Sequence, residues 1–444
     1  MGFITKIWAS EIFDSRGIPT IQVRCETQTG VVGVANVPSG ASTGSREALE
    51  LRDGDVKRFF GKGVLKAVKN VNEVIGPDLL GREVTAQYDI DQRMIEQDGT
   101  KNKSNLGANA ILGVSLAVAR AAAQELGLPL YQYLGGTTAT TLPVPMLNVI
   151  NGGAHANNTI DFQEFMIVPL GAKSFHQAMR MASEVFHSLK AILQQCGYQT
   201  NVGDEGGFSP NLRSPEEAFA ILQKAVVGAG YELGRNGIMF ALDVAASEFY
   251  DRKTGRYNYQ REAKAQSSDQ PIFRSSHQQQ VYLYDLAAKY PLVSIEDGFD
   301  ENDKVGFAQF MKRIGSPARL QSVGDDLFTT NPHLVARGIK ERLANSVLVK
   351  VNQIGTLSET IATVRMAQRA GWTAIISHRS GETEDTFIAD LAVALNTGLI
   401  KTGSISRSER VAKYNRLLAI ERELGAKAEF LGCSAFSNLD WSSD

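Results

Sequence analysis

Residues 346–350, Ser-Val-Leu-Val-Lys, form a short apolar run that ends in a lysine, and runs of this kind occur six times from residue 238 onward. The residues that end these runs are Asp243, Glu296, Asp325, Lys350, His378 and Lys401. Successive members are 53, 29, 25, 28 and 23 residues apart, and four of these steps match one strand, one helix and two short loops. The repeat predicts a β/α barrel with all six residues on one rim, at the carboxyl ends of the strands, where barrel enzymes do their chemistry.

Three of these six residues, Asp243, Glu296 and Asp325, are carboxylates. Hard oxygen ligands favour Mg²⁺ over zinc, so the rim is predicted to hold a divalent cation. Asp297 and Asp326 directly follow two of the acids. Adjacent residues of a strand point to opposite sides, so only one of each pair need reach the metal. The sequence alone leaves open which one does.

Lys350 is the candidate general base of this rim. Its neighbours Val349 and Val351 are β-branched and apolar, which predicts a largely buried side chain. Burial, a nearby cation and a second lysine all disfavour the ammonium form, so this lysine can be neutral and remove a weakly acidic carbon proton. The alternative is a partly buried lysine that only pairs with one of the carboxylates.

Three loops carry further candidates. Residues 37–44 are small and hydroxyl-rich, which suits a lid that closes over a polar ligand and presents Ser42 to a metal, although such loops are usually only connectors. A second loop offers His155 beside a glycine hinge. A third holds Glu205 between glycines on a tight turn, a suitable place for a general acid.

A fourth loop contains His378, Arg379 and Ser380. A helix is predicted over residues 380–395, so this loop would precede a helix N-terminus. The free N–H groups of that terminus, together with a guanidinium and a hydroxyl group, would form a phosphate-binding site.

The chain is predicted to begin with a small α+β domain. Residues 3–37 alternate apolar and polar and indicate an antiparallel sheet, and the pattern is helical from residue 45 to about 133. Residues 135–145 have neither period and contain two prolines, as is typical of a linker. The predicted domains are therefore 1–134 and 146–444.

One stretch of the barrel domain has no clear period. Residues 252–280 are polar and glutamine-rich near their end, and we expect a long irregular excursion on the surface. This excursion would account for the 53-residue step.

Composition excludes several classes of protein. With 43% hydrophobic and 21% charged residues and a net charge of −2, the 444-residue chain is typical of a globular protein without a nucleic-acid or membrane surface. Its longest helical uncharged stretch, residues 104–119, is too short for a bilayer span and predicts a buried helix. Three scattered cysteines and no apolar leader near residue 1 indicate the cytoplasm. An additional cell-surface or secreted pool is not readable from the sequence.

Ten motifs, taken together and in order along nearly the whole chain, resemble the enolase family. They are SGASTG (39–44), NGGAHANN (151–158), QEFM (163–166), GDEGGF (203–208), LDVAASEFYD (242–251), SIEDGF (294–299), VGDDLFTTN (323–331), KVNQIGTLSET (350–360), SHRSGETEDTFIADL (377–391) and IKTGSISRSER (400–410). The resemblance implies a glycolytic and gluconeogenic lyase that reversibly dehydrates 2-phosphoglycerate to phosphoenolpyruvate through a Mg²⁺-stabilised ene-diolate. It also implies a small α+β domain that caps a barrel beginning with two strands and two helices.

The resemblance further implies a role for each site residue. The proton-transfer residues are Lys350, as base at C2, and Glu205, as acid at the leaving hydroxyl group. The ligands of two Mg²⁺ ions are Asp243, Glu296 and Asp325 for the first and Ser42 for the second. The residues around the substrate are Arg379 and Ser380 at the phosphate, with His378 beside them, Lys401 near the carboxylate, and His155, Gln163 and Glu164 at the closing side.

Two residues depart from the family pattern, Ile18 where asparagine is usual and Lys304 where tryptophan is usual. Both lie outside the implied catalytic set. The resemblance also implies a homodimer, with an octamer as the alternative.

Two other functions were considered. A related barrel enzyme acting on a sugar acid or a muconate-type substrate would share the metal acids, but it would lack the Ser-His-Arg-Ser-Gly loop and the serine lid. A non-catalytic role, in surface adhesion or as a scaffold in an RNA-degrading assembly, is disfavoured because every implied catalytic residue is intact. Such a role in addition to catalysis stays open.

Overall fold

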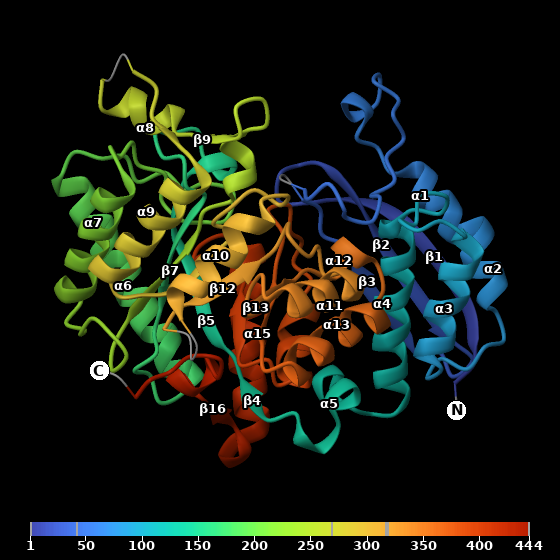
Figure 1. The fold of residues 1–444 in the computed structure, drawn as a ribbon. Coiled ribbons are helices and arrows are strands. Elements are labelled where there is room, and N and C mark those ends of the chain that lie inside the picture. The colour runs from blue at the N-terminus through green and yellow to red at the C-terminus, as the bar shows by residue number, and fades with distance from the viewer. Residues whose placement is uncertain (1, 41–42, 268–269, 316–318, 443–444) are drawn as a thin grey trace.

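The small domain is built on the predicted antiparallel sheet. The computed structural model describes residues 2–40, 43–267, 270–315 and 319–442 (Figure 1). The sheet consists of β1 (Ile4–Phe13), β2 (Pro19–Thr27) and β3 (Val32–Asn36) in that order. Helix α4 (Ala108–Glu125) packs on β2 and β3. It approaches so closely that a Cβ at Gly33 would lie 2.2 Å from the carbonyl oxygen of Ala117, which requires glycine in the strand.

The other helices of this domain lie beside the sheet and α4. They are η1 (Phe59–Gly61), α1 (Leu65–Asn70), η2 (Val71–Ile75), α2 (Gly76–Leu79), α3 (Gln87–Asp98), α5 (Leu130–Gly135) and η3 (Gly136–Thr138). The helical prediction is wrong for residues 45–58. The backbone there bonds to other segments instead: the N–H of Ala48 donates to the carbonyl of Gln353 at 2.8 Å, which ties this segment to the barrel domain.

The second part of the chain is the predicted barrel, and it is closed. Its strands are β5 (Val144–Asn151), β6 (Glu164–Val168), β7 (Met239–Asp243), β11 (Leu292–Glu296), β12 (Gln321–Gly324), β13 (Ser346–Val349), β14 (Thr373–Ser377) and β15 (Leu399–Lys401). All neighbours pair in parallel except β6, which is antiparallel to both β5 and β7. The two strands β5 and β6 are followed by two helices, α6 (Phe175–Gln195) and α7 (Pro215–Gly228), as the family resemblance implies.

The later strands alternate with helices in the way the spacing predicts. These helices are α9 (Ser276–Lys289), α10 (Lys304–Ile314), α11 (Pro332–Glu341), α12 (Val351–Ile354), α13 (Leu357–Arg369), α14 (Phe387–Ala394) and α15 (Ser408–Leu424). A short parallel pair, β4 (Thr141–Leu142) with β16 (Glu429–Phe430), lies outside the barrel.

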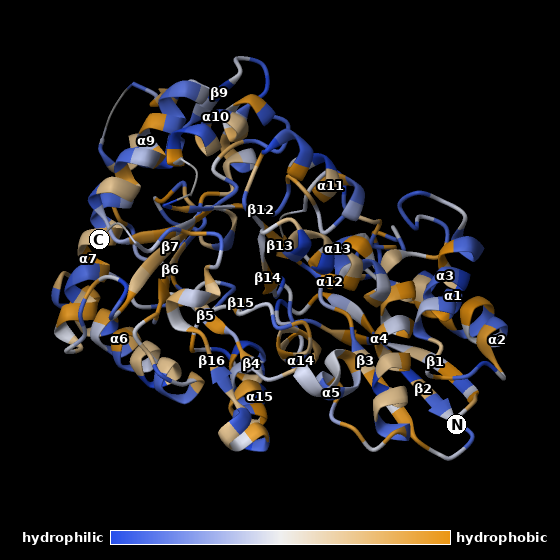
Figure 2. Cartoon of the chain, turned by 60° about the horizontal axis from the view of Figure 1, so that its bottom comes forward, coloured by the Kyte–Doolittle hydropathy of each residue, from blue (hydrophilic) through white to orange (hydrophobic). Residues whose placement is uncertain are grey.

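An apolar cluster packs the inside of the barrel. It takes at least one side chain from every barrel strand, namely Val144, Met146, Met166, Val168, Ala241, Val293, Val323, Leu348, Ile375 and Leu399. Figure 2 shows the apolar character of β6 and β7. Phe436, from the C-terminal segment, is fully buried in the same cluster. The barrel is therefore a packed core, and only its rim is available for chemistry.

Two local predictions are corrected. The excursion at residues 252–280 is not irregular, because β8 (Tyr250–Asp251), β9 (Arg256–Asn258) and β10 (Phe273–Arg274) form a small antiparallel sheet, with α8 (Gln260–Ala265) between the last two. This sheet is held by aromatic packing: the guanidinium of Arg274 lies 3.8 Å from the ring centroid of Tyr259 and 3.9 Å from that of Tyr282.

The helix predicted from residue 380 begins only at Phe387. Glu382 prevents an earlier start, because its carboxylate accepts the N–H groups of Arg379 and Thr383 and an ion pair from Lys413 at 2.9 Å. The N–H groups of α14 therefore do not reach the Arg379 loop, and the predicted helix N-terminus at the phosphate site is wrong.

The small domain caps a barrel helix. The N–H of Leu357 donates to Ser115 Oγ at 3.0 Å, and the N–H of Ser358 donates to Asp91 Oδ2 at 3.0 Å. N-terminal helix N–H groups have no partner within their own helix, so these two bonds from α4 and α3 satisfy the first turn of α13. Because α13 follows Lys350 by a few residues, the contact helps to fix the segment after the candidate base.

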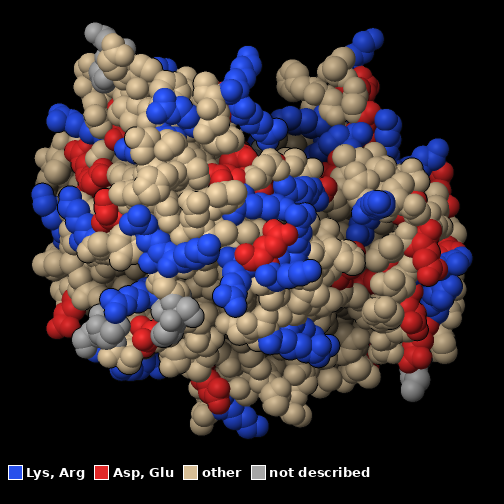
Figure 3. Space-filling view, in the orientation of Figure 1, with Lys and Arg blue, Asp and Glu red and all other residues tan. Residues whose placement is uncertain are grey.

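The distribution of surface charge and the length of the apolar helices bear on whether the chain could bind nucleic acid or cross a membrane. Basic and acidic side chains are interspersed on the face shown in Figure 3, as the net charge of −2 leads one to expect. No single helix within the described ranges has both the length and the apolar composition to cross a membrane. One bent pair, Ala108–Glu125 with Leu130–Thr138 at 96°, meets these criteria by length and composition alone.

The buried carboxyl of Asp91 predicts a pH-dependent contribution to stability. Burial raises its pKa from the ordinary 3.8 to about 6. The folded state then binds more protons than the unfolded state, so stability is greatest below the unfolded pKa and is lost as the pH rises from about 4 to about 6, by at most about 3 kcal/mol. Asp91→Asn should lack this loss, so the difference in unfolding free energy between parent and variant should change across that pH window.

Urea unfolding at pH 4.5 and pH 7 measures this free-energy difference, with substitution of the exposed Asp89, Asp89→Asn, as control. A pH-independent difference would contradict the assignment.

Candidate active site

The predicted rim residues meet at one end of the barrel. Asp243, Glu296 and Lys401 are the last residues of β7, β11 and β15, while Asp325 and Lys350 directly follow β12 and β13. Parallel strands bring their carboxyl ends to one rim, so the spacing in the sequence becomes proximity in space. All of these residues except Glu296 line one pocket, which also contains Ser377, His378, Arg379 and Ser380.

Glu164 reaches the same rim because β6 runs the other way. It is the first residue of β6 and pairs in register with Asp243, the last residue of β7. In a parallel strand the first residue would lie at the opposite end of the barrel. Gln163, directly before it, donates from Nε2 to Asp243 Oδ2 at 3.2 Å.

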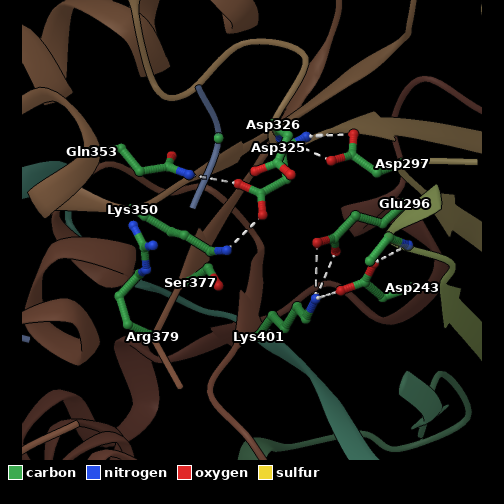
Figure 4. Close-up of polar contacts among 12 residues, drawn as sticks. Asp243, Glu296, Asp297, Asp325, Asp326, Lys350, Gln353, Ser377, Arg379 and Lys401 are labelled. Atoms are coloured by element: carbon green, nitrogen blue, oxygen red, sulfur yellow. Dashed lines mark hydrogen bonds and ion pairs between the residues drawn. The ribbon is translucent and has the colours of Figure 1, made fainter. Parts of the chain in front are cut away.

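Lys401 binds the acids on one side of the pocket (Figure 4). Its Nζ lies 2.9 Å from Asp243 Oδ2, 2.8 Å from Glu296 Oε2 and 3.3 Å from Glu164 Oε2. Burial opposes the charge of Lys401, but the carboxylates, Asp243 first, outweigh it and raise the pKa of Lys401 well above its ordinary range. Burial and the adjacent Asp243 in turn raise the pKa of Glu296.

Lys350 pairs with the third acid. Its Nζ lies 2.5 Å from Asp325 Oδ2, and Gln353 Nε2 donates to Asp325 Oδ1 at 2.8 Å. Burial alone would lower the pKa of Lys350, but the Asp325 carboxylate outweighs it and the pKa is raised. In this structure the lysine is therefore charged and paired, the alternative considered for it, and a neutral Lys350 requires that Asp325 first be engaged by another cation.

Asp297 has a different environment from the acid before it. Its two carboxylate oxygens accept the backbone N–H groups of Asp325 at 3.0 Å and Asp326 at 2.7 Å. These bonds fix the turn that carries Asp325. The backbone of Asp297 has φ of 40°, a left-handed conformation that turns its side chain toward the next strand. We infer that Glu296 rather than Asp297 faces the lysine side of the pocket.

The carboxylate of Glu205 is surrounded by the side chains of His378, Asn148 and His155. Its Oε2 is 3.3 Å from His378 Nε2 and accepts from Asn148 Nδ2 at 3.0 Å. Its Oε1 is 3.5 Å from His155 Nδ1, which is equally 3.5 Å from Glu164 Oε1. Burial, and then the neighbouring Glu205 carboxylate, raise the pKa of Glu164 well above its ordinary range. Two acids and two imidazoles thus form one buried cluster of titratable groups.

The Arg379 loop meets the small domain. The guanidinium of Arg379 binds Glu47 at 2.9 Å and Asn352 Oδ1 at 3.2 Å. Next to it, the backbones of Ser39 and Gly381 exchange hydrogen bonds of 2.7 and 2.9 Å. Ser39 therefore joins the small domain to the loop that carries Arg379. Ser42, the residue predicted to reach a metal, lies outside the described residues.

Several residues of the site were missed by the sequence reasoning. They are Glu47, Asn148, Asn352, Gln353 and Arg410. Gln353 and Asn352 follow Lys350 within one helical turn, and this position was the signal that could have identified them. The other three come from distant segments, and only Arg410, at the end of the motif 400–410, lies in one of the ten family motifs.

The donor set fits a hard divalent cation. Two groups of described residues bring possible ligand atoms within 4.8 Å of one another, Asp297 with Asp325 and Asp326, and His155 with Glu164 and Glu205. The predicted triad of Asp243, Glu296 and Asp325 is divided between the ammonium groups of Lys401 and Lys350. Mg²⁺ binds through carboxylate oxygens, so an ion at this triad would replace ammonium contacts of Lys350 and Lys401.

A closed β/α barrel whose carboxyl-end rim gathers buried acids, two lysines and two histidines defines a barrel enzyme with an acid-base site. Residues 4–134 match the model of the enolase N-terminal domain, and residues 139–439 match that of the enolase C-terminal TIM barrel domain. An enolase of Mycoplasmoides gallisepticum is 57% identical over 443 residues, covering 98% of this chain and 92% of that protein. The chain belongs to the enolase family and is a hydro-lyase, a phosphopyruvate hydratase; the family implies a divalent metal.

The hydrogen bond from Gln353 to Asp325 is expected to support metal binding. Gln353→Leu removes one of the two side-chain donors to Asp325 and leaves the Thr330 hydroxyl, which now bonds Gln353 Oε1 at 2.7 Å, without its acceptor. We expect the affinity for divalent cations to fall by about 10- to 100-fold. Calorimetric titration with Mg²⁺ measures this, and Gln368→Leu, an exposed glutamine of α13, is the control. Equal affinities in the two variants would show that Asp325 needs no such support.

Proposed function

We propose that this chain dehydrates 2-phosphoglycerate reversibly to phosphoenolpyruvate through an ene-diolate, with Mg²⁺ as its metal. The observation that carries the proposal is the convergence of a lysine, two acids and two histidines on one buried rim, opposite an arginine loop suited to phosphate. Family membership supports the overall reaction. The metal identity and the role of each residue are our inference from the family resemblance together with the site.

The proposed ligands of the first Mg²⁺ are Asp243, Glu296 and Asp325, and Ser42 is proposed for the second. When bound, the two ions would stabilise the second negative charge that forms on the substrate carboxylate after C2 loses its proton. Lys401, already held among three carboxylates, is proposed to lie at that carboxylate and to add to this stabilisation. A fixed ammonium group needs no reorganisation as the charge develops.

Lys350 is the proposed base at C2. Its ammonium bond to Asp325 must be relieved before it can accept a proton, and a cation on Asp325 would do this by neutralising the carboxylate that raises the pKa of Lys350. Gln353 then keeps Asp325 in place through its own hydrogen bond.

Glu205 is the proposed acid at the C3 hydroxyl group. Its position between His378 and His155 orients the carboxyl and excludes water. Burial opposes the charge of Glu205, but His378 and then His155 outweigh it and lower the pKa of Glu205 well below its ordinary range, so the acid role requires that Glu205 gain a proton when substrate binds. Glu164, whose pKa is raised, and His155 are proposed to line the side of the site that closes over the substrate, with Gln163 beside them. Arg379 and Ser380 are proposed to bind the phosphate, and Glu47 with Asn352 holds the guanidinium plane ready for a bidentate contact.

The remaining expectations are also proposals. We propose a small domain at 1–134, a linker at 135–145 and a catalytic barrel at 146–444, acting as a homodimer, or alternatively an octamer, in the cytoplasm. Ile18 is compatible with the family role of its turn, since it contributes its backbone N–H to Asp14 Oδ1 at 2.9 Å, a bond that does not depend on the side chain.

The metal assignment predicts the effect of removing each ligand. Asp243→Ala, Glu296→Ala and Asp325→Ala should each abolish turnover and weaken Mg²⁺ binding, because each carboxylate would supply one oxygen to the first ion. Turnover is followed by the absorbance of phosphoenolpyruvate with and without a chelator, and binding by calorimetry. Unchanged Mg²⁺ affinity in one variant would transfer that ligand role to its neighbour, Asp297 for Glu296 or Asp326 for Asp325.

The two proton-transfer residues should differ in solvent exchange. The proposed stepwise reaction uses Lys350 first and Glu205 only when the hydroxyl group leaves. Glu205→Gln should therefore still exchange the C2 proton with deuterated solvent while losing phosphoenolpyruvate formation, whereas Lys350→Ala should lose both. NMR of 2-phosphoglycerate in D₂O distinguishes the two. Exchange at the parent rate in Lys350→Ala would show that another residue is the base.

A further inference from the structure

Arg410 is a fully buried arginine beside the site, and none of the roles above uses it. It lies in α15, and its guanidinium reaches into the two loops that carry Glu205 and Arg379. It donates to the carbonyl oxygens of Arg379 at 2.5 Å, Ser380 at 2.6 Å and Asp204 at 3.0 Å. Its Nη1 also lies 2.5 Å from His378 Nδ1.

The contact with Arg410 decides where His378 carries its proton. A guanidinium has only donors, so Nδ1 of His378 must be the acceptor. The single proton of the neutral imidazole is then on Nε2. That nitrogen lies 3.3 Å from Glu205 Oε2, a contact without hydrogen-bond geometry in this structure, and it has no hydrogen-bond partner among the described residues. Burial lowers the pKa of His378 to about 3, so the ring stays neutral.

The same contacts distinguish the two oxygens of Glu205. Oε2 faces two N–H donors, His378 Nε2–H and the Asn148 amide at 3.0 Å. A carboxyl oxygen has two lone pairs, so donation by both groups would leave none for a proton on Oε2. Oε1 faces His155 Nδ1 at 3.5 Å, an atom without a hydrogen-bond partner among the described residues.

We propose that Arg410 is a positioning residue that fixes His378 as the Nε2–H tautomer and thereby confines the transferable proton of Glu205 to Oε1. The inference rests on the proposed role of Glu205 as the acid. The tautomer itself is independent of that role and can be measured without substrate.

The first test is the nitrogen NMR spectrum of the parent protein with ¹⁵N-labelled histidine. The chain has only six histidines, and His378→Gln identifies the signals of residue 378 by their loss. We expect an unprotonated Nδ1 and a protonated Nε2 at neutral pH. A protonated Nδ1, or a doubly protonated ring, would overturn the proposal.

The second test compares variants of α15. Arg410→Met should allow His378 to adopt either neutral tautomer. It should slow phosphoenolpyruvate formation by about 10- to 100-fold, as loss of a hydrogen bond that orients a site residue typically does. Exchange of the C2 proton should continue. Arg410→Lys keeps a donor and should restore the Nε2–H tautomer. The control, Arg416→Met, removes another guanidinium of the same helix, which pairs with Asp390.

The outcomes separate the inference from the proposed function. A folded Arg410→Met that keeps the Nε2–H tautomer and the parent rate would refute the positioning role, and if this variant does not fold, the parent spectrum decides. The expected tautomer together with a fully active Glu205→Gln would instead refute the acid role of Glu205 and leave the assignment of His378 intact.

Discussion

The site depends on the neutralisation of buried carboxylates by buried ammonium groups. Asp243, Glu296 and Asp325 lie where water cannot screen them, and like charges in such a place would drive one another to the protonated form. Lys401 and Lys350 oppose this by direct contact. The barrel can therefore hold three carboxyl groups on one rim. The lysines are also the groups proposed to act on the substrate, so the stability of the pocket and its chemistry use the same side chains.

The small domain supports residues of this pocket. Glu47 holds the Arg379 guanidinium, and Ser39 pairs with the backbone beside it. From the barrel side, Gln353 bonds both Asp325 and the backbone of Ala48. These bonds cross from one domain to the other, and one of them reaches Gln353, three residues after the candidate base. A separated barrel would retain its acids but would lose the supports that orient them.

The sequence predicted the barrel, the antiparallel sheet of the small domain and the convergence of the rim residues. The rim could be predicted because the spacing of the apolar runs shows where each barrel strand ends. The sequence-based prediction failed where side chains distant in sequence determine the backbone conformation. The helix expected from residue 380 is delayed by Glu382, whose carboxylate is committed to nearby N–H groups and to Lys413. Arg410 ends the motif 400–410, but its role was missed for a similar reason, since its partners lie 32 and 206 residues away. The charge state of Lys350 likewise depends on a neighbour, Asp325, that only the fold supplies.

The reversed direction of β6 has a consequence beyond Glu164. In a regular barrel every helix returns the chain to the amino ends of the strands, so loops that follow helices lie far from the reacting groups. Here β6 delivers the chain to that far end first, and α6 must then carry it back. The connection between α6 and α7, with Glu205 on it, consequently opens onto the catalytic face. One inverted strand thus gives this enzyme an additional loop for chemistry, and its length could vary without disturbing any strand-to-helix connection of the barrel.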